Sequence, residues 1–469
     1  MKQQFNFSFI NLGCTKNLVD SQYLLGHLFD MGANNPHYAV NYFADPYEKE
    51  NDFVFLNTCG FIETGRKEML DTLHELLANG KIVYLLGCGL EYYMGLKGNN
   101  GIKGAKDKFL SNHSPLSNLF YLSWNDFENI TIKKLMDGYN STTFGEFNFS
   151  KGPRVYTNVE EKFEYLKIAE GCDNRCTFCI IPKIRGKQRS LPIEKVLEEA
   201  KHMIKAGIQE IILIAQDTTR YGSDLYGKPV LFELLEKLDK LRGDFKYRLL
   251  YLYPDVVTLK QLENLTKLKK FIPYFDIPLQ HISSSVLKRM GRFYDEEYIG
   301  KFLTSIKELF SVHFIRTNLI IGFPGETEKD FEKLKKFVLK SDFDNIALFE
   351  YHDEPFATSS KLSHKVPSGE IRKRFLEMRK LVESLQVIKS KVRKGEQDVG
   401  YIMGFTLKSG KATEGNEGVP QGGIKTLTIR PWLHAPEIDS YDEIGREQVL
   451  ATFDSPTEAN IGDRIVYIV

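Results

Sequence analysis

Residues 172–179 read Cys172-Asp173-Asn174-Arg175-Cys176-Thr177-Phe178-Cys179. The three thiols follow a C-x3-C-x2-C pattern, and thiolates are soft ligands that suit iron–sulfur clusters. A four-iron cluster would take only three ligands from this stretch, which leaves one iron open to bind another molecule. A zinc knuckle or three unrelated buried thiols is the weaker interpretation, because zinc sites usually add a second ligand pair at a distance and the sequence shows none.

Length and composition set the outer limits of the fold. The chain has 469 residues, 42% of them hydrophobic, which predicts about two to four domains with ordinary cores. It has no run of 18 apolar residues, and its first residues lack the apolar core of a signal peptide, so we expect a cytoplasmic protein with reduced thiols. A net charge of +1 gives the whole chain no nucleic-acid footprint.

The other three cysteines follow a repeated pattern near the amino terminus. Apolar runs at 7–12, 53–56 and 82–86 predict strands, and each ends at a Cys beside a Gly, followed by a helix. Alternating strands and helices imply a parallel sheet, which binds ligands beyond the carboxyl ends of its strands. One such thiol would usually be buried packing, but three at equivalent strand ends predict a second three-thiolate site. Its residues are Cys14, Cys59 and Cys88.

The helix after the first strand is expected to bury one apolar face, made of Leu18, Leu25, Leu28 and Phe29. Residues 119–122 form a possible further strand, and the Gly-, Ser-, Thr- and Asn-rich stretch 137–153 is interpreted as a linker.

The central part predicts six strand–helix units, where a complete barrel would need eight. The expected strands are 165–169, 211–214, 247–252, 274–277, 314–321 and 346–350. Polar residues follow five of them, at positions that would share one rim of a partial barrel. They are Gln216-Asp217-Thr218, Tyr253-Pro254, Gln280-His281, Gly322-Phe323-Pro324-Gly325-Glu326 and Tyr351-His352. Singly, the glycine-rich stretch is explained as a turn before a helix capped by Thr327, and His281 as a structural hydrogen-bonding residue.

Basic residues alternate just past the thiol loop, at Lys183, Arg185, Lys187 and Arg189. A solvated face explains this alternation at least as well as a functional role. The functional alternative is the steering of an acidic target or an acidic cofactor.

The carboxyl-terminal part predicts a connecting helix at 371–394 and then a small all-β barrel. Its candidate strands are 399–405, 426–429, 449–453 and 464–469. Residues 396–469 hold twelve acidic and six basic residues, a net charge of −6. Such a domain would repel phosphates and suit a basic protein partner.

The thiol loop, with the aromatic Phe178 before its last Cys, resembles the signature of the radical S-adenosylmethionine (radical SAM) enzymes. Residues 13–21, 57–62 and 87–88 resemble the amino-terminal domain of the methylthiotransferases within that superfamily, so that every cysteine is accounted for. The resemblance implies two 4Fe-4S clusters. The one on Cys172, Cys176 and Cys179 binds and cleaves SAM to a 5′-deoxyadenosyl radical, and the one on Cys14, Cys59 and Cys88 supplies the sulfur.

The resemblance also implies that all six cysteines are catalytic, and it places further residues near SAM: Phe178, Gln216, Gly322, Phe323, Pro324 and Gly325. The expected domains are a methylthiotransferase domain at 1–140, a radical SAM domain at 158–392 and an OB-like TRAM domain at 395–469. A flavodoxin or ferredoxin is the expected electron donor.

Three motifs, at 216–218, 276–281 and 435–439, resemble the RimO branch of this family, which methylthiolates the β-carbon of an aspartate in the small-subunit ribosomal protein S-twelve. Two alternatives stay open: a tRNA adenosine methylthiotransferase of the MiaB branch, and a non-catalytic iron–sulfur carrier. Gln22 and Thr15 depart from the family pattern, which commonly has Glu and Pro, and an insertion at 413–423 lengthens a loop of the last domain.

Overall fold

The computed structural model describes residues 2–33, 35–94, 117–141 and 152–393, together with parts of 397–468 that comprise six strands, residues 433–436 and residue 439. The amino-terminal region, residues 2–141, forms a five-stranded sheet in the order β2-β1-β3-β4-β5, and every pairing is parallel. Its strands are β1 (Gln3–Asn11), β2 (Tyr38–Tyr42), β3 (Phe53–Thr58), β4 (Ile82–Gly87) and β5 (Leu119–Tyr121). The predicted parallel sheet is confirmed, and β2 is an additional edge strand.

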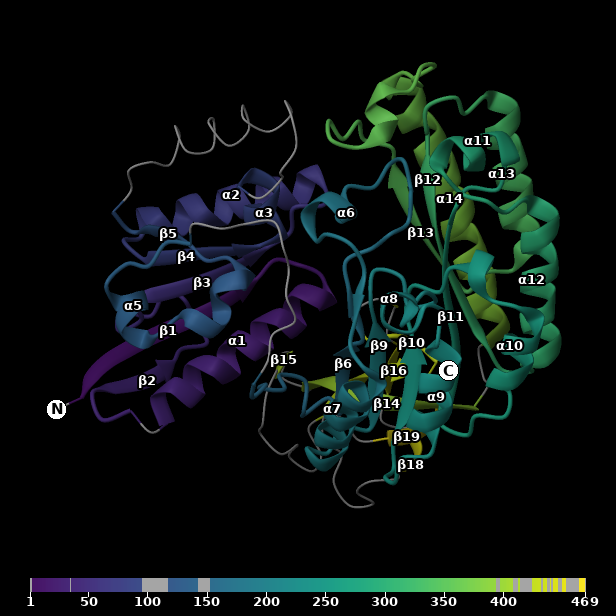
Figure 1. The fold of residues 1–469 in the computed structure, drawn as a ribbon. Helices are drawn as coiled ribbons and strands as arrows, with labels where there is room; N and C mark the ends of the chain where they lie inside the picture. Colours follow the sequence, from purple (N-terminus) through teal and green to yellow (C-terminus); the bar gives the residue numbers. More distant parts are fainter. Residues whose placement is uncertain are drawn as a thin grey trace.

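Helices cover both faces of this sheet (Figure 1). α1 (Thr15–Ala33), η1 (Trp124–Asn129) and α5 (Ile132–Met136) pack on one face, and α2 (Glu63–Ala78) and α3 (Cys88–Met94) pack on the other. The expected apolar face of α1 is only partly right. Leu25 and Leu28 are buried against the sheet, but Phe29 is 37% exposed, because the helix turns a second face toward the rest of the protein.

The central region, residues 152–393, holds a six-stranded parallel sheet in the order β6-β9-β10-β11-β12-β13. Its strands are β6 (Phe163–Lys167), β9 (Glu210–Ile214), β10 (Lys246–Leu249), β11 (Phe271–Gln280), β12 (Phe314–Ile321) and β13 (Asn345–Glu350). Strands adjacent in the sequence are adjacent in the sheet, as in a singly wound α/β barrel. The six predicted strands are therefore found, with boundaries that shift by a few residues.

One face of the central sheet is covered by a layer of helices (Figure 1), whose apolar side chains form the largest core cluster. They include α7 (Ile193–Lys205), α9 (Leu231–Asp239), α10 (Leu259–Leu265), α12 (Glu296–Leu309), α13 (Glu328–Ser341) and α14 (Ser368–Arg393). The other face carries a second cluster in which Val19 of α1 and Ala435 of the carboxyl-terminal part pack on the strands. The inner face of the sheet is thus covered by parts of the chain far apart in the sequence.

The carboxyl-terminal part forms an antiparallel sheet in the order β17-β16-β14-β19-β18, with β15 paired to β14. Its strands are β14 (Gln397–Leu407), β15 (Ala412–Thr413), β16 (Ile424–Pro431), β17 (Asp442–Gly445), β18 (Val449–Thr452) and β19 (Arg464–Ile468). Residues 414–423 of the predicted insertion lie outside the described residues, as do residues 142–151 of the predicted linker.

Arg430 and the described residues 433–436 of this part dock on the central sheet where its strands begin. Arg430 and Arg248 bind the two carboxylate oxygens of Glu210, at 2.8 and 2.5 Å, and all three side chains are fully buried. Arg248 also donates to the carbonyl of Leu433, and the Tyr165 hydroxyl donates to the carbonyl of Pro436. A buried ionic contact therefore covers the end of the sheet at which the strands begin. The carboxyl ends of the strands, on the opposite side, remain available for a site.

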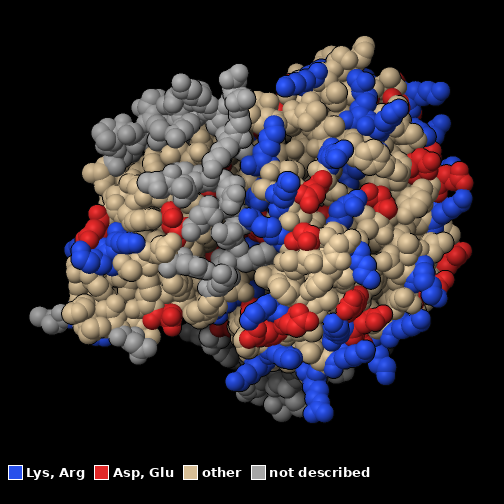
Figure 2. All heavy atoms as spheres, in the orientation of Figure 1, with Lys and Arg blue, Asp and Glu red and all other residues tan. Residues whose placement is uncertain are grey.

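Figure 2 shows Lys and Arg interspersed with Asp and Glu over the central region on the face in view. No helix among the described residues is long and apolar enough to cross a membrane.

Candidate active site at the junction of two parallel sheets

The Cys172 loop lies between two short strands and is held from three sides. It follows β7 (Ala169–Glu170), which pairs with β8 (Arg189–Ser190) in an antiparallel hairpin. The Cys172 amide donates to the carbonyl of Gly186 at 3.2 Å, and the Thr177 amide donates to the carbonyl of Met290 at 3.0 Å. The end of α11 (Ser284–Met290) therefore fixes the loop against the central sheet.

The three thiols of this loop are neighbours in a largely apolar setting. Burial raises the pKa of Cys172 to about 12, and the nearby Cys176 thiol contributes to the rise. Burial also raises the pKa of Cys179, to which Cys176 and Cys172 both add. Backbone amides donate to two sulfurs, from Asn174 to Cys172 and from Ile181 to Cys179, both at 3.4 Å. Amides directed at sulfur are the surroundings that an anionic iron–sulfur cluster requires.

The other three thiols lie at the carboxyl ends of neighbouring strands. Cys14 follows β1 and is exposed, Cys59 follows β3 and is half-buried, and Cys88 follows β4 and is buried. Burial raises the pKa of Cys88 to about 12, and Cys14 and Cys59 add to the rise, which identifies the three thiols as neighbours. The sheet brings the three strand ends together, as the sequence predicts.

Glycines let the loops of this thiol group approach one another. A Cβ atom on Gly60 would lie 2.1 Å from the carbonyl oxygen of Cys88, and one on Gly65 would lie 3.2 Å from the Cys59 sulfur. The Cys59 and Cys88 segments can therefore approach this closely only with glycine at position 60, and Gly65 of α2 leaves the Cys59 side chain room beside the helix.

The fit of an iron–sulfur cluster rests on the donor set. Among the described residues, no group of three or more His, Cys, Asp and Glu side chains is arranged to hold a metal ion. A four-iron cube spreads its thiolate ligands more widely than the coordination sphere of one ion does. Two groups of three thiols, each free of disulfides, match such a cube in ligand type and number.

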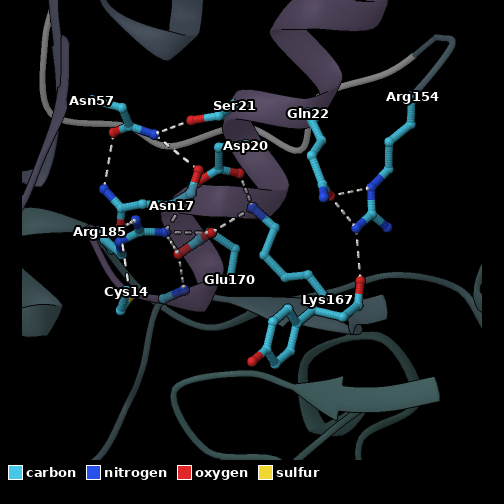
Figure 3. Close-up of polar contacts among 12 residues, drawn as sticks. Cys14, Asn17, Asp20, Ser21, Gln22, Asn57, Arg154, Lys167, Glu170 and Arg185 are labelled. Carbon is cyan, nitrogen blue, oxygen red and sulfur yellow. Dashed lines mark hydrogen bonds and ion pairs between the residues drawn. The ribbon is translucent and has the colours of Figure 1, made fainter. Parts of the chain in front are cut away.

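A buried polar network lies between α1 and the central region, and it reaches Cys88 of the amino-terminal thiol group. Figure 3 shows the part of it around Asp20, Glu170 and Arg185. Arg185, which follows α6 (Ile181–Ile184), is 1% exposed, and its Nε donates to the Cys88 sulfur at 3.0 Å. Its Nη1 contacts both carboxylate oxygens of Glu170 at 2.8 Å, and its Nη2 donates to Asn17 Oδ1 at 2.7 Å. Lys167 binds Asp20 and Glu170 in the same network.

Arg185 is therefore not part of a solvated face, as the alternation of basic residues suggested. Lys183 and Lys187 are exposed, but Arg185 turns inward because Asp20 and Glu170 supply buried countercharges. The second alternative, steering of an acidic target, does not describe Arg185 either, since solvent does not reach it.

The departure at Gln22 has a local explanation. Its amide nitrogen donates to Glu164 at 2.9 Å, and its amide oxygen accepts from Arg154 Nε at 2.9 Å. A glutamate in this position would place a second carboxylate against Glu164, whereas the amide bridges an acid and a base. Nothing in the structure explains Thr15 in place of Pro.

The polar residues after β9 belong to the same junction. Gln216 donates to Glu170 at 2.7 Å, and Asp217 accepts from the Asn174 side chain of the thiol loop at 2.7 Å. After β11, His281 accepts a hydrogen bond from the Ser283 amide at 2.9 Å and lies 3.5 Å from Glu326. His281 and its surroundings are buried, which agrees with the structural role considered for it.

The Gly322–Glu326 turn lies beside Phe178. The Phe178 and Phe323 rings meet edge to face, with centroids 6.4 Å apart. Glu326 accepts from the Gly322 amide at 2.9 Å, and Thr327 caps α13 as expected. The carbonyl of Pro324 accepts from Arg289 at 3.0 Å, and the Gly325 amide donates to the carbonyl of His364. Phe323 is fully buried and packs against the Phe178 ring, which it holds in place.

Sequence reasoning missed Arg292, which follows α11. It is 5% exposed, and its Nε and Nη1 have no hydrogen-bond partner. Its guanidinium lies 4.4 Å from the centroid of the Tyr253 ring and 5.8 Å from that of Phe178. A buried cation with unused donors beside three thiols suits an anionic group at this place. The signal in the sequence is faint, because one arginine after a helix is ordinary.

Two glycines of the thiol hairpin provide a matched test of the loop. Gly171 and Gly186 both have positive φ, at 75° and 76°, but a Cβ on Gly171 would lie 2.1 Å from the Lys187 carbonyl, while one on Gly186 would meet nothing within 4 Å. Gly186→Ala should cost only the backbone term, about 1–2 kcal/mol, and keep the iron of the Cys172 loop. Gly171→Ala should also separate the hairpin and lose most of that iron, measured per chain after anaerobic reconstitution. Equal iron in both variants would contradict this.

Two family models match this chain, and each covers most of one of the two parallel sheets. Residues 166–338 match the model of the Radical SAM superfamily, and residues 6–96 match that of the uncharacterized protein family UPF0004. The ribosomal protein uS12 methylthiotransferase RimO of Carboxydothermus hydrogenoformans is 35% identical and covers 94% of this chain and 93% of its own length. The RimO proteins of Aquifex aeolicus (35% identical, covering 93% and 91%) and Clostridium tetani (38% identical, covering 77% and 78%) are similar.

Among solved structures, the radical SAM methyltransferase TsrM of Kitasatospora setae has the same fold at a TM-score of 0.51 and 12% identity, over 74% of this chain and 73% of its own. That likeness concerns the fold alone. The identity over nearly the full length of several relatives is decisive for the family, and the chain belongs to the RimO family of radical SAM methylthiotransferases.

Proposed function

We propose that this protein transfers a methylthio group to the β-carbon of an aspartate in ribosomal protein uS12. The relatives that resemble it over nearly their whole length carry the name ribosomal protein uS12 methylthiotransferase RimO. The observation that carries the proposal is the contact of Arg185, on the segment that follows the Cys172 loop, with the amino-terminal thiol group: its Nε donates to the Cys88 sulfur at 3.0 Å. A reaction that uses two clusters needs the two cluster sites to lie close together.

Cys172, Cys176 and Cys179 would hold one 4Fe-4S cluster, and Cys14, Cys59 and Cys88 would hold the second. When bound, the first cluster with SAM supplies a radical able to remove hydrogen from an unactivated carbon, and the second supplies the sulfur. The chain supplies the rest: Cys88 and Cys172 are buried, and the network around Glu170 and Arg185 fixes the segments beside them.

We assign SAM to the space beside the Cys172 loop. Phe178, braced by Phe323, offers an aromatic face for the adenine, and Gln216 offers an amide fixed by Glu170. The turn formed by Gly322, Phe323, Pro324 and Gly325 borders the same space. Arg292, with unused donors, is the nearby cation that would face an anionic group.

The domain organisation that goes with this function has three parts: a methylthiotransferase domain at 1–140, a radical SAM domain at 158–392 and a TRAM domain at 395–469. The central sheet would form a partial barrel of six strand–helix units, and the antiparallel sheet the OB-like TRAM barrel. The −6 charge of residues 396–469 favours a basic protein substrate over RNA. A cytoplasmic location and reduction by a flavodoxin or ferredoxin complete the proposal.

The proposal is tested by mass spectrometry of ribosomal proteins from cells with and without this gene. We expect one aspartate of uS12 to carry one methylthio group only when the gene is present. Nucleosides of tRNA from the same cells are the parallel measurement, and their methylthioadenosine should not change. A change in the tRNA nucleosides with unmodified uS12 would favour the MiaB-like alternative, and no change in either would favour an iron–sulfur carrier.

A further inference from the structure

Arg185 contacts both sides of the junction through one guanidinium group. Its Nε donates to the Cys88 sulfur at 3.0 Å, and its Nη2 donates to Asn17 Oδ1 at 2.7 Å, so two of its contacts reach the amino-terminal region. Its Nη1 contacts Glu170 of the central region at 2.8 Å. Figure 3 shows the side chain lying between α1 and the hairpin. One side chain thus spans the interface at the thiol that is most deeply buried of its group.

The orientation of Arg185 is fixed by the buried carboxylate of Glu170. Glu170 is 0% exposed, and both of its carboxylate oxygens contact Arg185 Nη1. The same carboxylate accepts from Gln216 at 2.7 Å and from Lys167 at 3.0 Å. The Gly171 amide donates to it as well, at 3.1 Å. A carboxylate with four donors around it keeps one position, so the Nε–H of Arg185 stays aimed at sulfur.

The backbone beside Arg185 belongs to the Cys172 loop. The carbonyl of Gly186, the next residue, accepts from the Cys172 amide at 3.2 Å. The chain therefore runs from Cys172 through one hydrogen bond and one residue to Arg185, and from there through one hydrogen bond to Cys88.

A hydrogen bond to a ligating sulfur changes the cluster that the sulfur holds. An N–H donor on a thiolate withdraws electron density from the iron, and a fixed positive charge stabilises the reduced, more negative cluster. Both effects raise the reduction potential. Among the contacts of the described residues, Cys88 is the thiol of its group that accepts a hydrogen bond from an arginine, so the hydrogen bond acts at Cys88 and the positive charge acts on the whole group.

We propose that Arg185 is a positioning residue that sets the reduction potential of the cluster on Cys14, Cys59 and Cys88 and fixes the Cys88 ligand relative to the Cys172 loop. This inference rests on the proposed second cluster. It adds that the amino-terminal cluster is tuned by a side chain from the segment that follows the loop of the other cluster.

The potential is measured in chains in which Cys172, Cys176 and Cys179 are alanine, so that only the amino-terminal cluster contributes to the electron paramagnetic resonance signal. In this background Arg185→Met should keep the iron but move the reduction potential to a more negative value. In the otherwise native chain, Arg185→Met should lower methylthio transfer by about 10- to 100-fold, the usual loss for a residue behind a metal ligand, while SAM cleavage persists.

Arg154 gives a matched control. Its guanidinium is also buried at the junction, but it binds Gln22, Glu164 and Glu199 and no thiol. Arg154→Met should lower stability and leave the potential unchanged. Arg185→Lys, which keeps the charge without the planar fork, should shift the potential less than Arg185→Met does.

The outcomes separate the inference from the proposed function. A loaded amino-terminal cluster whose potential is the same in Arg185→Met and in the parent chain overturns the inference and leaves the function intact. A parent chain that binds no amino-terminal cluster overturns the proposed function. If Arg185→Met does not load the cluster, the neutral Arg185→Gln, which keeps N–H donors for Glu170, is measured instead, and an unshifted potential in that variant overturns the inference.

Discussion

Cys172→Ala is expected to abolish cleavage of SAM, whereas Cys14→Ala is expected to preserve it and to end methylthio transfer. The division follows from the fold, because Cys172 lies on the hairpin of the central region and Cys14 follows β1 of the other sheet. The products, 5′-deoxyadenosine and methylthiolated peptide, are measured together by liquid chromatography and mass spectrometry after reduction with dithionite. Each variant should retain about four irons after anaerobic reconstitution.

Two further variants are the controls for this division. Cys176→Ala should behave as Cys172→Ala does, and Cys59→Ala as Cys14→Ala does, because each belongs to the same thiol group. If Cys14→Ala and Cys172→Ala instead lost the same product and nothing else, the assignment of one cluster to cleavage and the other to sulfur transfer would be wrong. A total of about four irons in the parent chain would remove the second cluster altogether.

The sites at strand ends could be predicted from the sequence because they depend on local order. A strand followed by Gly and Cys and then by a helix places that Cys at the carboxyl edge of a parallel sheet, whatever the rest of the chain does. Cys14, Cys59 and Cys88 were found in this way. The six central strands were recognised by the same alternation of short apolar runs and amphipathic helices.

The burial of the polar side chains of α1 could not be predicted, because the helix packs against the amino-terminal sheet and the central region at once. Lys16, Asn17 and Asp20 read as the solvated side of an amphipathic helix, yet they are buried against the central region. Their partners, among them Lys167 and Arg185, are about 150 residues away in the sequence. Helical periodicity identifies the face that meets the sheet, and it carries no information about a second interface.

Arg185 shows the same limit in a single residue. Its spacing from Lys183 and Lys187 suggested a row of solvated charges, and only the meeting of Asp20 and Glu170 in space makes a buried position favourable. The motif at 435–439 was noticed for its resemblance to the family. That Ala435 packs on the inner face of the central sheet follows from tertiary structure alone.

Glu210→Gln is expected to be among the most destabilising single changes in the chain, at about 3–5 kcal/mol. Glu210 is the shared carboxylate of two buried arginines, Arg248 at 2.5 Å and Arg430 at 2.8 Å. An amide of the same shape fills the space but leaves two guanidinium groups without their countercharge in a place that water does not reach. The loss should appear in calorimetric unfolding of the cluster-free chain, as a lower unfolding temperature of the central sheet.

The control for this change is Glu297→Gln on α12, where the carboxylate pairs with Lys301 at 2.7 Å on the exposed surface. Exposed pairs contribute little, so the unfolding temperature should not change measurably. Adding Arg430→Met to Glu210→Gln should recover part of the loss, since one uncompensated charge remains instead of two. Equal stability of the Glu210→Gln and Glu297→Gln variants would show that solvent screens this ion pair. The carboxyl-terminal segment would then be held on the central sheet by its other contacts, those of Tyr165 with Pro436 and of Asn345 with Asp439.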